Sequence, residues 1–268
     1  MLELIQITND PAFARRCDAL DGLRLFVDLE RLGKAERQAG RNTFISGHQI
    51  EDIGKVKRVL RRSPLMVRIN PLHEGTPAEV ESALQEGADR LMLPMFTRSS
   101  EVREFTAVVA GRVPVSLLLE TAAALECIDD WIALPGLDEV YVGLNDLHLS
   151  MGHRFMFEPL AKGFVERVAI AAKRHKLRFG FGGIARLDEG LLPGCDVLAE
   201  HLRLGSRSVI LSRTFHRGED GESFEAEVAK LRRAEAQLSQ RTPGQIDEDA
   251  RRIAAVIQRI AAEMGRAA

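Results

Sequence analysis

The chain has 268 residues, of which 45% are hydrophobic and 28% charged, as is usual for a globular protein. Its net charge of −2 gives no electrostatic reason to expect nucleic acid or an anionic membrane as a partner. No apolar run reaches the roughly 18 residues of a transmembrane helix, and the first residues lack the pattern of a signal peptide. The three isolated cysteines, Cys17, Cys127 and Cys195, predict buried thiols in a reducing compartment, so we expect a cytoplasmic protein.

Eight short apolar runs recur along the chain, and none of them alternates between apolar and polar side chains. Continuous runs of this kind are typical of strands that are buried on both faces of a parallel sheet. We predict strands at Leu4–Thr8, Arg24–Leu29, Leu65–Ile69, Arg90–Leu93, Val115–Leu119, Glu139–Leu144, Arg178–Phe181 and Ser208–Leu211.

Helical patterns separate these runs. Pro11 is placed to begin one helix, and an apolar stripe predicts another over residues 160–175. Thr76 and Glu79 have the spacing of a capping box, which predicts a helix start at Thr76. Eight strands alternating with helices predict an α/β fold of the (β/α)8 TIM-barrel class. An open doubly wound sheet is the alternative, but no GxGxxG motif follows the first strand.

Two segments depart from a minimal barrel. A long loop follows the second strand and precedes a helix predicted at Ile53–Arg61, and long loops at this end of a barrel usually build the site. The tail, residues 218–268, shows no strand pattern, so we divide the chain into a barrel of residues 1–217 and a C-terminal helical tail. The tail carries an apolar helical stripe at Ile246, Ile253, Val256, Ile257, Ile260 and Met264. We hypothesise that it docks on, or is exchanged with, a neighbouring subunit.

Two acids follow neighbouring predicted strands, where the carboxyl ends of a barrel face the active site. Glu120 comes after the fifth strand and Asp146 after the sixth, with a helix-like segment over residues 121–134 between them. Two carboxylates completed by water and substrate oxygens suit a hard divalent cation such as Mg²⁺ or Mn²⁺. The alternative from spacing alone is that Glu120 caps the next helix and Asp146 takes part in a turn.

Arg68 lies on an apolar strand, where a guanidinium has to meet an anion or be heavily hydrogen-bonded. It could pair bidentately with a substrate carboxylate, or it could form a structural salt bridge to Glu30 or Glu120. Asp28 and Glu30 alternate with apolar neighbours, so we expect both on one side of the second strand. They could orient metal-bound water, or one of them could be a general base.

Histidines and glycines near the predicted site have ordinary structural explanations as well. A lone histidine is more often structural than catalytic, and four lie near site loops: His48, His73, His148 and His153. The glycines of residues 180–183 are similar to a phosphate-cradling loop, but they could equally serve a close approach of the backbone.

Five segments carry a pattern that extends over about residues 2–215. They are VDLE at 27–30, VRIN at 67–70, GADRLMLPMF at 87–96, LLLET at 117–121 and GLDEVYVGLNDLHLSMG at 136–152. Together they resemble the HpcH/HpaI aldolase and citrate lyase β-subunit family, within the phosphoenolpyruvate/pyruvate barrels.

The resemblance implies that Glu120 and Asp146 hold a divalent metal, Mg²⁺ or Mn²⁺. A 2-oxo acid such as pyruvate would bind that metal through its keto oxygen and carboxylate. Arg68 would stabilise the enolate oxygen, and the backbone around Leu144, Asn145 and Asp146 would take the substrate carboxylate.

The chain departs from the resemblance where the base is expected. In the aldolase branch a histidine follows the acid of the second strand, but Arg31 stands there in this chain. His48, in the long loop, is the candidate for the missing base, and Glu30 is the candidate for ordering metal-bound water or the proton path.

The substrate pocket departs as well. In the citrate lyase-like branch a lysine usually follows the proline after the fourth strand, whereas Met95 follows Pro94 here. This difference weakens the hypothesis that the substrate is a coenzyme A thioester. His148 stands where a small serine is usual, so it could reshape the pocket.

We therefore expect a metal-dependent carbon–carbon lyase of the class II aldolase type, acting on a 2-oxo acid through a metal-stabilised enolate. Citrate lyase-like cleavage of a coenzyme A thioester and a non-catalytic oxo-acid-binding barrel are the alternatives. The expected assembly is a homo-oligomer, a trimer or hexamer, without nucleic acid or membrane partners.

Overall fold

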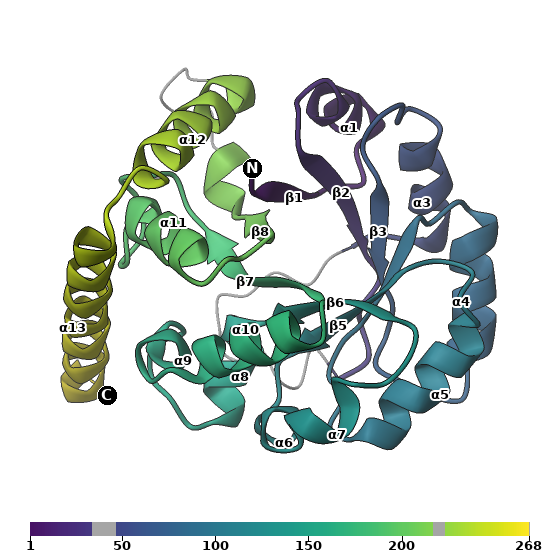
Figure 1. Ribbon diagram of the computed structural model, residues 1–268. Coiled ribbons are helices and arrows are strands. Elements are labelled where there is room, and N and C mark those ends of the chain that lie inside the picture. The colour runs from purple at the N-terminus through teal and green to yellow at the C-terminus, as the bar shows by residue number, and fades with distance from the viewer. Residues whose placement is uncertain (34–46, 217–222, 268) are drawn as a thin grey trace. The chain divides into compact units, whose positions relative to one another are not determined.

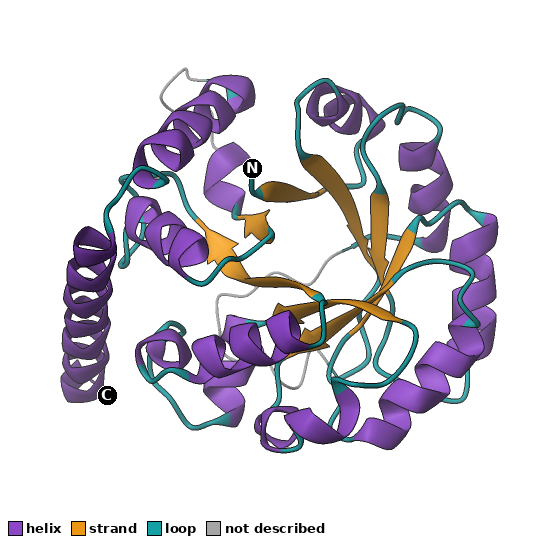
Figure 2. Ribbon diagram, in the orientation of Figure 1, coloured by secondary structure: helices purple, strands orange, loops and turns teal. Residues whose placement is uncertain are grey.

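The computed structural model describes residues 1–33, 47–216 and 223–267 of the chain. Within these residues eight strands follow one another in the closed order β1 to β8, with helices between them along the chain (Figures 1 and 2). The predicted (β/α)8 TIM barrel is therefore confirmed. The strands are β1 (Glu3–Ile7), β2 (Leu23–Asp28), β3 (Leu65–Arg68), β4 (Arg90–Leu93), β5 (Val115–Leu119), β6 (Leu137–Val142), β7 (Arg178–Ile184) and β8 (Ser208–Leu211).

The helices agree with the sequence patterns in most places. The segment predicted as one helix over residues 121–134 is two short helices that meet at Cys127. The helix predicted at Ile53–Arg61 begins and ends a turn earlier. The helices are α1 (Pro11–Asp18), α3 (Ile50–Lys57), α4 (Thr76–Gln85), α5 (Ser99–Val109), α6 (Ala122–Glu126), α7 (Ile128–Trp131), α8 (Leu144–Ser150), α9 (Glu158–Ala161), α10 (Phe164–Arg174), α11 (Gly194–Arg203), the 3-10 helix η1 (Arg213–His216), α12 (Phe224–Leu238) and α13 (Pro243–Ala267).

The chain forms two compact units, residues 5–141 and residues 1–4 with 142–268. In residues 5–141, strands β2 to β5 pair in parallel, with Val27 opposite Val67 and Leu93 opposite Leu117. Every residue of β2 and β5 is buried. Burial on both faces of these strands explains why their sequences are continuous apolar runs.

A buried ion pair joins the starts of β2 and β6 in the same unit. Arg24 donates from Nη1 to Oε2 of Glu139 at 2.5 Å and from Nη2 to Oε1 at 3.1 Å. Ser116 of β5 donates its hydroxyl to Oε2 of Glu139 at 2.7 Å. Arg24 is 1% exposed and Glu139 is not exposed at all, so the pair lies in the core. The sequence pattern did not predict this ion pair, because a charged residue at the edge of an apolar run is typical of the exposed start of a strand.

In the unit of residues 142–268, the described part of the tail, residues 223–267, contains the helices α12 and α13, which have different surroundings. α12 packs on α11 and η1, and its Glu235 accepts the backbone N–H of Leu2, so α12 stands in the place of the helix that follows β8. α13 is the addition, and it packs on α9 and α11 (Figure 1). The boundary predicted at residue 217 lies outside the described residues.

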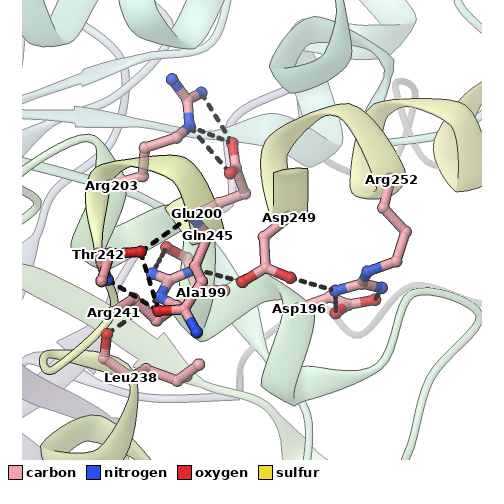
Figure 3. Close-up of polar contacts among 10 residues, drawn as sticks. All are labelled: Asp196, Ala199, Glu200, Arg203, Leu238, Arg241, Thr242, Gln245, Asp249 and Arg252. Atoms are coloured by element: carbon pink, nitrogen blue, oxygen red, sulfur yellow. Dashed lines mark hydrogen bonds and ion pairs between the residues drawn. The ribbon is translucent and has the colours of Figure 1, made fainter. Parts of the chain in front are cut away.

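Apolar and charged contacts both attach α13 to its own unit. Ile253 and Ile257 of the predicted stripe are buried. Figure 3 shows Arg252 forming a two-point pair with Asp196 of α11, at 2.7 and 3.0 Å. Arg241, just before α13, donates to the carbonyl of Ala199 at 2.9 Å. No helix in the described parts of the chain is long and apolar enough to cross a membrane.

Candidate functional site

Arg68, the last residue of β3, is held between two carboxylates. The strand register places Asp28 of β2 opposite Arg68, and its two oxygens accept hydrogen bonds from Nε and Nη2, each at 2.8 Å. Oε2 of Glu30 lies 3.1 Å from Nη1. The salt bridge to Glu30, one of the alternatives for Arg68, is thus confirmed, and Asp28 makes the closer pair.

The guanidinium of Arg68 stays charged and within reach of a ligand. Burial by itself lowers the pKa of Arg68, but the charges of Asp28, Glu30 and Glu120 outweigh it and raise that pKa above its ordinary value. The side chain of Arg68 is 14% exposed. Asp28 takes two of the five N–H groups of the guanidinium and Glu30 lies against a third at Nη1, so the guanidinium still keeps donors for an oxygen of a substrate.

His48, at the far end of the long loop, is bound beside β2. Its Nδ1 accepts a hydrogen bond from the backbone N–H of Asp28 at 3.1 Å, and its carbonyl accepts one from Nη2 of Arg31 at 2.7 Å. The residue is 8% exposed. An N–H directed at Nδ1 places the proton of a neutral imidazole on Nε2. In this tautomer Nε2 carries an N–H that can donate a hydrogen bond, and it has no free lone pair with which to accept a proton.

Asn70, just after β3, holds the other end of the same loop. Its Oδ1 accepts the backbone N–H groups of Arg31 at 2.8 Å and Leu32 at 3.0 Å. Its Nδ2 donates to Oε1 of Glu79 at 2.8 Å. Both ends of the loop are therefore fixed to the ends of β2 and β3, while residues 34–46 between them lie outside the described residues.

The capping box predicted at Thr76 and Glu79 is wrong, although α4 does begin at Thr76. Gly75 is the N-cap residue. The carboxylate of Glu79 is directed to Asn70, and burial raises the pKa of Glu79. A pattern of local capping residues could not reveal that Asn70, nine residues before Glu79, donates to this carboxylate.

Glu120 follows β5 and is 3% exposed. Its Oε1 accepts the backbone N–H of Met95 at 3.2 Å, just beyond β4. The N-cap of α6 is Thr121, whose hydroxyl accepts the N–H of Ala124. The alternative that Glu120 caps the following helix is therefore wrong, and its carboxylate is turned toward the carboxyl ends of the strands.

The first turn of α8 carries Leu144, Asn145 and Asp146, directly after β6. An acid in a first turn interacts favourably with the helix dipole, so Asp146 has a structural role as well. The side chain of Leu144 is 1% exposed and packs on β7, where a Cβ added to Gly182 would lie 2.9 Å from Cδ1 of Leu144. For Gly182 the close-approach explanation is confirmed, and Leu144 can reach a ligand only through its backbone.

The other histidines of interest make local contacts. Nδ1 of His148 donates to the carbonyl of Leu144 at 3.1 Å, one helical turn away, and the residue is 7% exposed. Nδ1 of His73 accepts the N–H of Gly75 at 2.8 Å. Burial lowers the pKa of His153. These contacts fit the structural explanation for His73 and His148.

The side chains of Glu120 and Asp146 offer the oxygen donors that a hard divalent cation prefers. Among the described residues, no group of three or more His, Cys, Asp or Glu side chains is gathered for a metal ion. Glu120 and Asp146 follow strands that are neighbours in the closed order, and each offers carboxylate oxygens. Mg²⁺ is commonly bound through one or two carboxylates, with waters and substrate oxygens completing its coordination.

Comparison with known proteins identifies relatives over about half of the chain. The family model HpcH/HpaI aldolase/citrate lyase matches residues 35–178. The (3S)-malyl-CoA thioesterase of Cereibacter sphaeroides is 27% identical over 135 residues, 49% of this chain and 47% of that protein. The hydroxypyruvate/pyruvate aldolase of Roseovarius nubinhibens is 23% identical over 171 residues, 52% of this chain and 66% of that protein. The chain thus spans about half the length of the thioesterase that it matches.

Solved structures resemble the chain over most of its length. The citrate lyase β subunit of M. tuberculosis, complexed with oxaloacetate and magnesium, has a TM-score of 0.57 and 17% identity, and the match covers 87% of this chain and 96% of that one. At this identity the likeness shows the barrel fold alone.

Proposed function

The chain belongs to the HpcH/HpaI aldolase/citrate lyase family, and within it we propose a carbon–carbon lyase of the class II aldolase type that acts on a 2-oxo acid. The observation that carries this proposal is the guanidinium of Arg68, fixed at the carboxyl end of β3 by Asp28 and Glu30. Cleavage next to a 2-oxo group sends an electron pair onto the keto oxygen. A positioned cation that meets this oxygen stabilises the charge as it develops.

Glu120 and Asp146 are the residues that would hold Mg²⁺ or Mn²⁺. Such a cation would supply Lewis-acid polarisation of the keto group. Support for a divalent cation comes from the M. tuberculosis citrate lyase β subunit, which was solved with magnesium and oxaloacetate. The backbone N–H groups of Leu144 and Asn145, at the start of α8, would take the substrate carboxylate, because the first N–H groups of a helix have no partner within it.

His48 and Glu30 are proposed to serve the proton transfers, His48 by holding a water and Glu30 by accepting a proton. Retro-aldol cleavage removes a proton from the aldol hydroxyl and returns one to the carbon that was cleaved. The Asp28 N–H on Nδ1 leaves neutral His48 with a hydrogen-bond donor at Nε2, and loss of that proton would leave an imidazolate. We therefore assign His48 to hold, through Nε2–H, the water that gives a proton to the cleaved carbon, in place of the base role expected from the sequence. The hydroxide left behind recovers the proton taken from the aldol hydroxyl. Glu30, a carboxylate that is 1% exposed and lies beside Arg68, is assigned to accept the proton of the aldol hydroxyl, directly or through an ordered water.

A retro-aldol assay over a panel of 4-hydroxy-2-oxo acids, with and without Mg²⁺ or Mn²⁺, tests the proposal. We expect turnover that requires the cation. Glu120→Gln and Asp146→Asn should each abolish turnover and calorimetric Mn²⁺ binding without unfolding the protein, which a single cooperative melting transition verifies. Absence of both turnover and Mn²⁺ binding in the unaltered protein would contradict the proposal.

The substitution Arg68→Lys tests whether activity needs the bidentate geometry of the guanidinium or only its positive charge. Lysine keeps the charge but cannot reproduce the bidentate geometry, so kcat/KM should fall by about a hundredfold or more. Arg98→Lys, at a residue whose side chain is 73% exposed, is the matched control and should leave kcat/KM unchanged. Equal activity of Arg68→Lys and the control would remove Arg68 from the mechanism.

Cleavage of a coenzyme A thioester is the second candidate, because the malyl-CoA thioesterase is among the relatives. Activity that appears with malyl-CoA and not with free hydroxy-oxo acids would select it. If pyruvate or oxalate raises the melting temperature and no substrate is turned over, the barrel is a binding protein.

A further inference from the structure

A cationic pocket lies at the amino ends of β7 and β8, where α10 and α11 end. Its volume is about 510 Å³, and it is lined by five Lys and Arg side chains and by no carboxylate. We name this the α10–α11 pocket. The cations are Lys173, Lys176, Arg178, Arg203 and Arg207. Along β7, a seven-residue strand, the pocket is roughly 20 Å from the carboxyl end, so it is separate from the carboxyl-end site proposed above.

Two of the five cations are already paired with carboxylates that do not line the pocket. Arg178 donates to Oε2 of Glu3 at 2.6 Å. Arg203 pairs with Glu166 at 2.9 Å and with Glu200 at 2.8 Å, the latter visible in Figure 3. These pairs fix two guanidinium groups in place and account for their charge.

The other three cations have no such partner. In the described residues, the side chains of Lys173, Lys176 and Arg207 make no hydrogen bond or ion pair, and all three residues are exposed. Lys173 lies in the last turn of α10, where a cation interacts favourably with the helix dipole. Lys176 and Arg207 lie beyond the helix ends, so the dipole does not explain their convergence on the pocket.

Three backbone N–H groups at the pocket already have carbonyl partners, so a ligand would be bound there by side chains. The N–H groups of Leu177 and Ser206 are used within the turns that end α10 and α11, at 2.9 Å each, and the N–H of Arg207 bonds to Phe179 of β7. The wall also contains apolar side chains, among them Ala169 and Leu204. A pocket of this size admits a small organic molecule, and a bare phosphate would fill little of it.

We propose that the α10–α11 pocket binds a small organic molecule carrying two or more linked phosphoryl groups. Lysine ammonium and arginine guanidinium groups are the side chains that bind phosphate oxygens, and three unpaired cations match a di- or triphosphate better than a single phosphate. The apolar wall would contact the organic part.

Isothermal titration of the full chain with ADP, pyrophosphate, adenosine and citrate, in about 0.15 M salt without Mg²⁺, tests this. We expect ADP to bind once per chain, more tightly than pyrophosphate, and adenosine not to bind. The double variant Lys173→Gln/Arg207→Gln should weaken ADP binding by roughly tenfold or more, the effect of losing charge-assisted hydrogen bonds.

The matched control is Arg251→Gln/Arg259→Gln, which removes two exposed cations of α13. It should leave ADP binding unchanged. Equal weakening by both double variants would show non-specific attraction and overturn the proposal, as would citrate binding as tightly as ADP or no ADP binding at millimolar concentration. All variants lie at exposed positions, and unchanged melting temperatures verify that they fold.

Discussion

The carboxylate of Glu139 is fully buried and accepts hydrogen bonds from Arg24 and Ser116. Burial by itself raises its pKa, but the charge and hydrogen bonds of Arg24, together with Arg90 and Ser116, lower the pKa of Glu139 to about 2. The folded-state pKa is thus below that of the unfolded chain. The contribution of Glu139 to stability is present above about pH 4.5 and is lost as the pH falls toward 2.

Glu139→Gln should therefore destabilise the protein strongly. The variant leaves the guanidinium of Arg24, 1% exposed, without a counter-charge in the core. We expect the free energy of unfolding at neutral pH to fall by about 3–5 kcal/mol, measured by urea denaturation.

Asp138→Asn is the control for Glu139→Gln. Asp138 pairs with Arg90, but its side chain is 42% exposed, and exposed pairs contribute about 1 kcal/mol or less. If Glu139→Gln were as stable as Asp138→Asn, the Arg24–Glu139 pair would have no net role in holding the strands.

At the scale of elements, the strands were predictable because burial on both faces leaves a signal in the composition of each run. β4, β5 and β8 begin and end at the predicted residues, and Glu120 and Asp146 follow the strands to which they were assigned. The partners of Arg68 were harder to identify. Asp28 is 40 positions away, and only the register of β2 with β3 brings the two together.

Loops and short helices were less predictable, because their contacts depend on residues distant in sequence. The tautomer of His48 follows from an N–H of Asp28 across the loop, which no local pattern encodes. The break at Cys127 and the role of Asn70 likewise depend on tertiary contacts. α12 was missed because its residues were taken as part of the tail.

The packing of α11 on β7 makes a prediction about acid stability. His201 of α11 is fully buried, and its ring stacks on Phe181 of β7 with centroids 3.8 Å apart. Its Nδ1 lies 2.8 Å from the hydroxyl of Ser206. Burial lowers the pKa of His201 to about 3. Below about pH 6.5 the unfolded chain therefore binds a proton that the folded chain does not, and stability falls as the pH drops.

His201→Gln should flatten this dependence. Between about pH 7 and pH 5 we expect the unaltered protein to lose about 2 kcal/mol of unfolding free energy through His201, and the variant to lose correspondingly less. The measurement is urea denaturation at each pH. His175→Gln, at an exposed position after α10, should retain the original slope. If the unfolding free energy depends on pH with the same slope in all three proteins, His201 becomes protonated while α11 stays packed, and the prediction is wrong.

At the scale of the whole chain, the strand ends differ in what they carry. Asp28, Arg68 and Glu120 lie at or just beyond the carboxyl ends of their strands, as expected of a barrel site. The amino ends carry the Arg24–Glu139 pair in one unit and the α10–α11 pocket in the other. Substitutions at the carboxyl ends should therefore act on turnover, and those at the amino ends on stability or on the second ligand.

The tail is the part of the chain that bears on assembly. α13 buries Ile253, Ile257 and Ile260 within its own unit, whereas Met264, from the same predicted stripe, is 39% exposed and Val256 is half-buried. We propose that these two residues face a neighbouring subunit in a homo-oligomer, or that the whole helix is exchanged with one.

Deleting residues 241–268 should lower the mass measured by light scattering to that of one chain, because the shared helix would be lost. Val256→Glu/Met264→Glu keeps the buried face of α13 and introduces charge only on the remaining apolar side chains. It should lower the mass as well if α13 docks on a neighbour, with little change in melting temperature. Ala255→Glu, at an exposed position, is the control. An oligomer that survives the deletion unchanged would show that α13 serves its own chain alone.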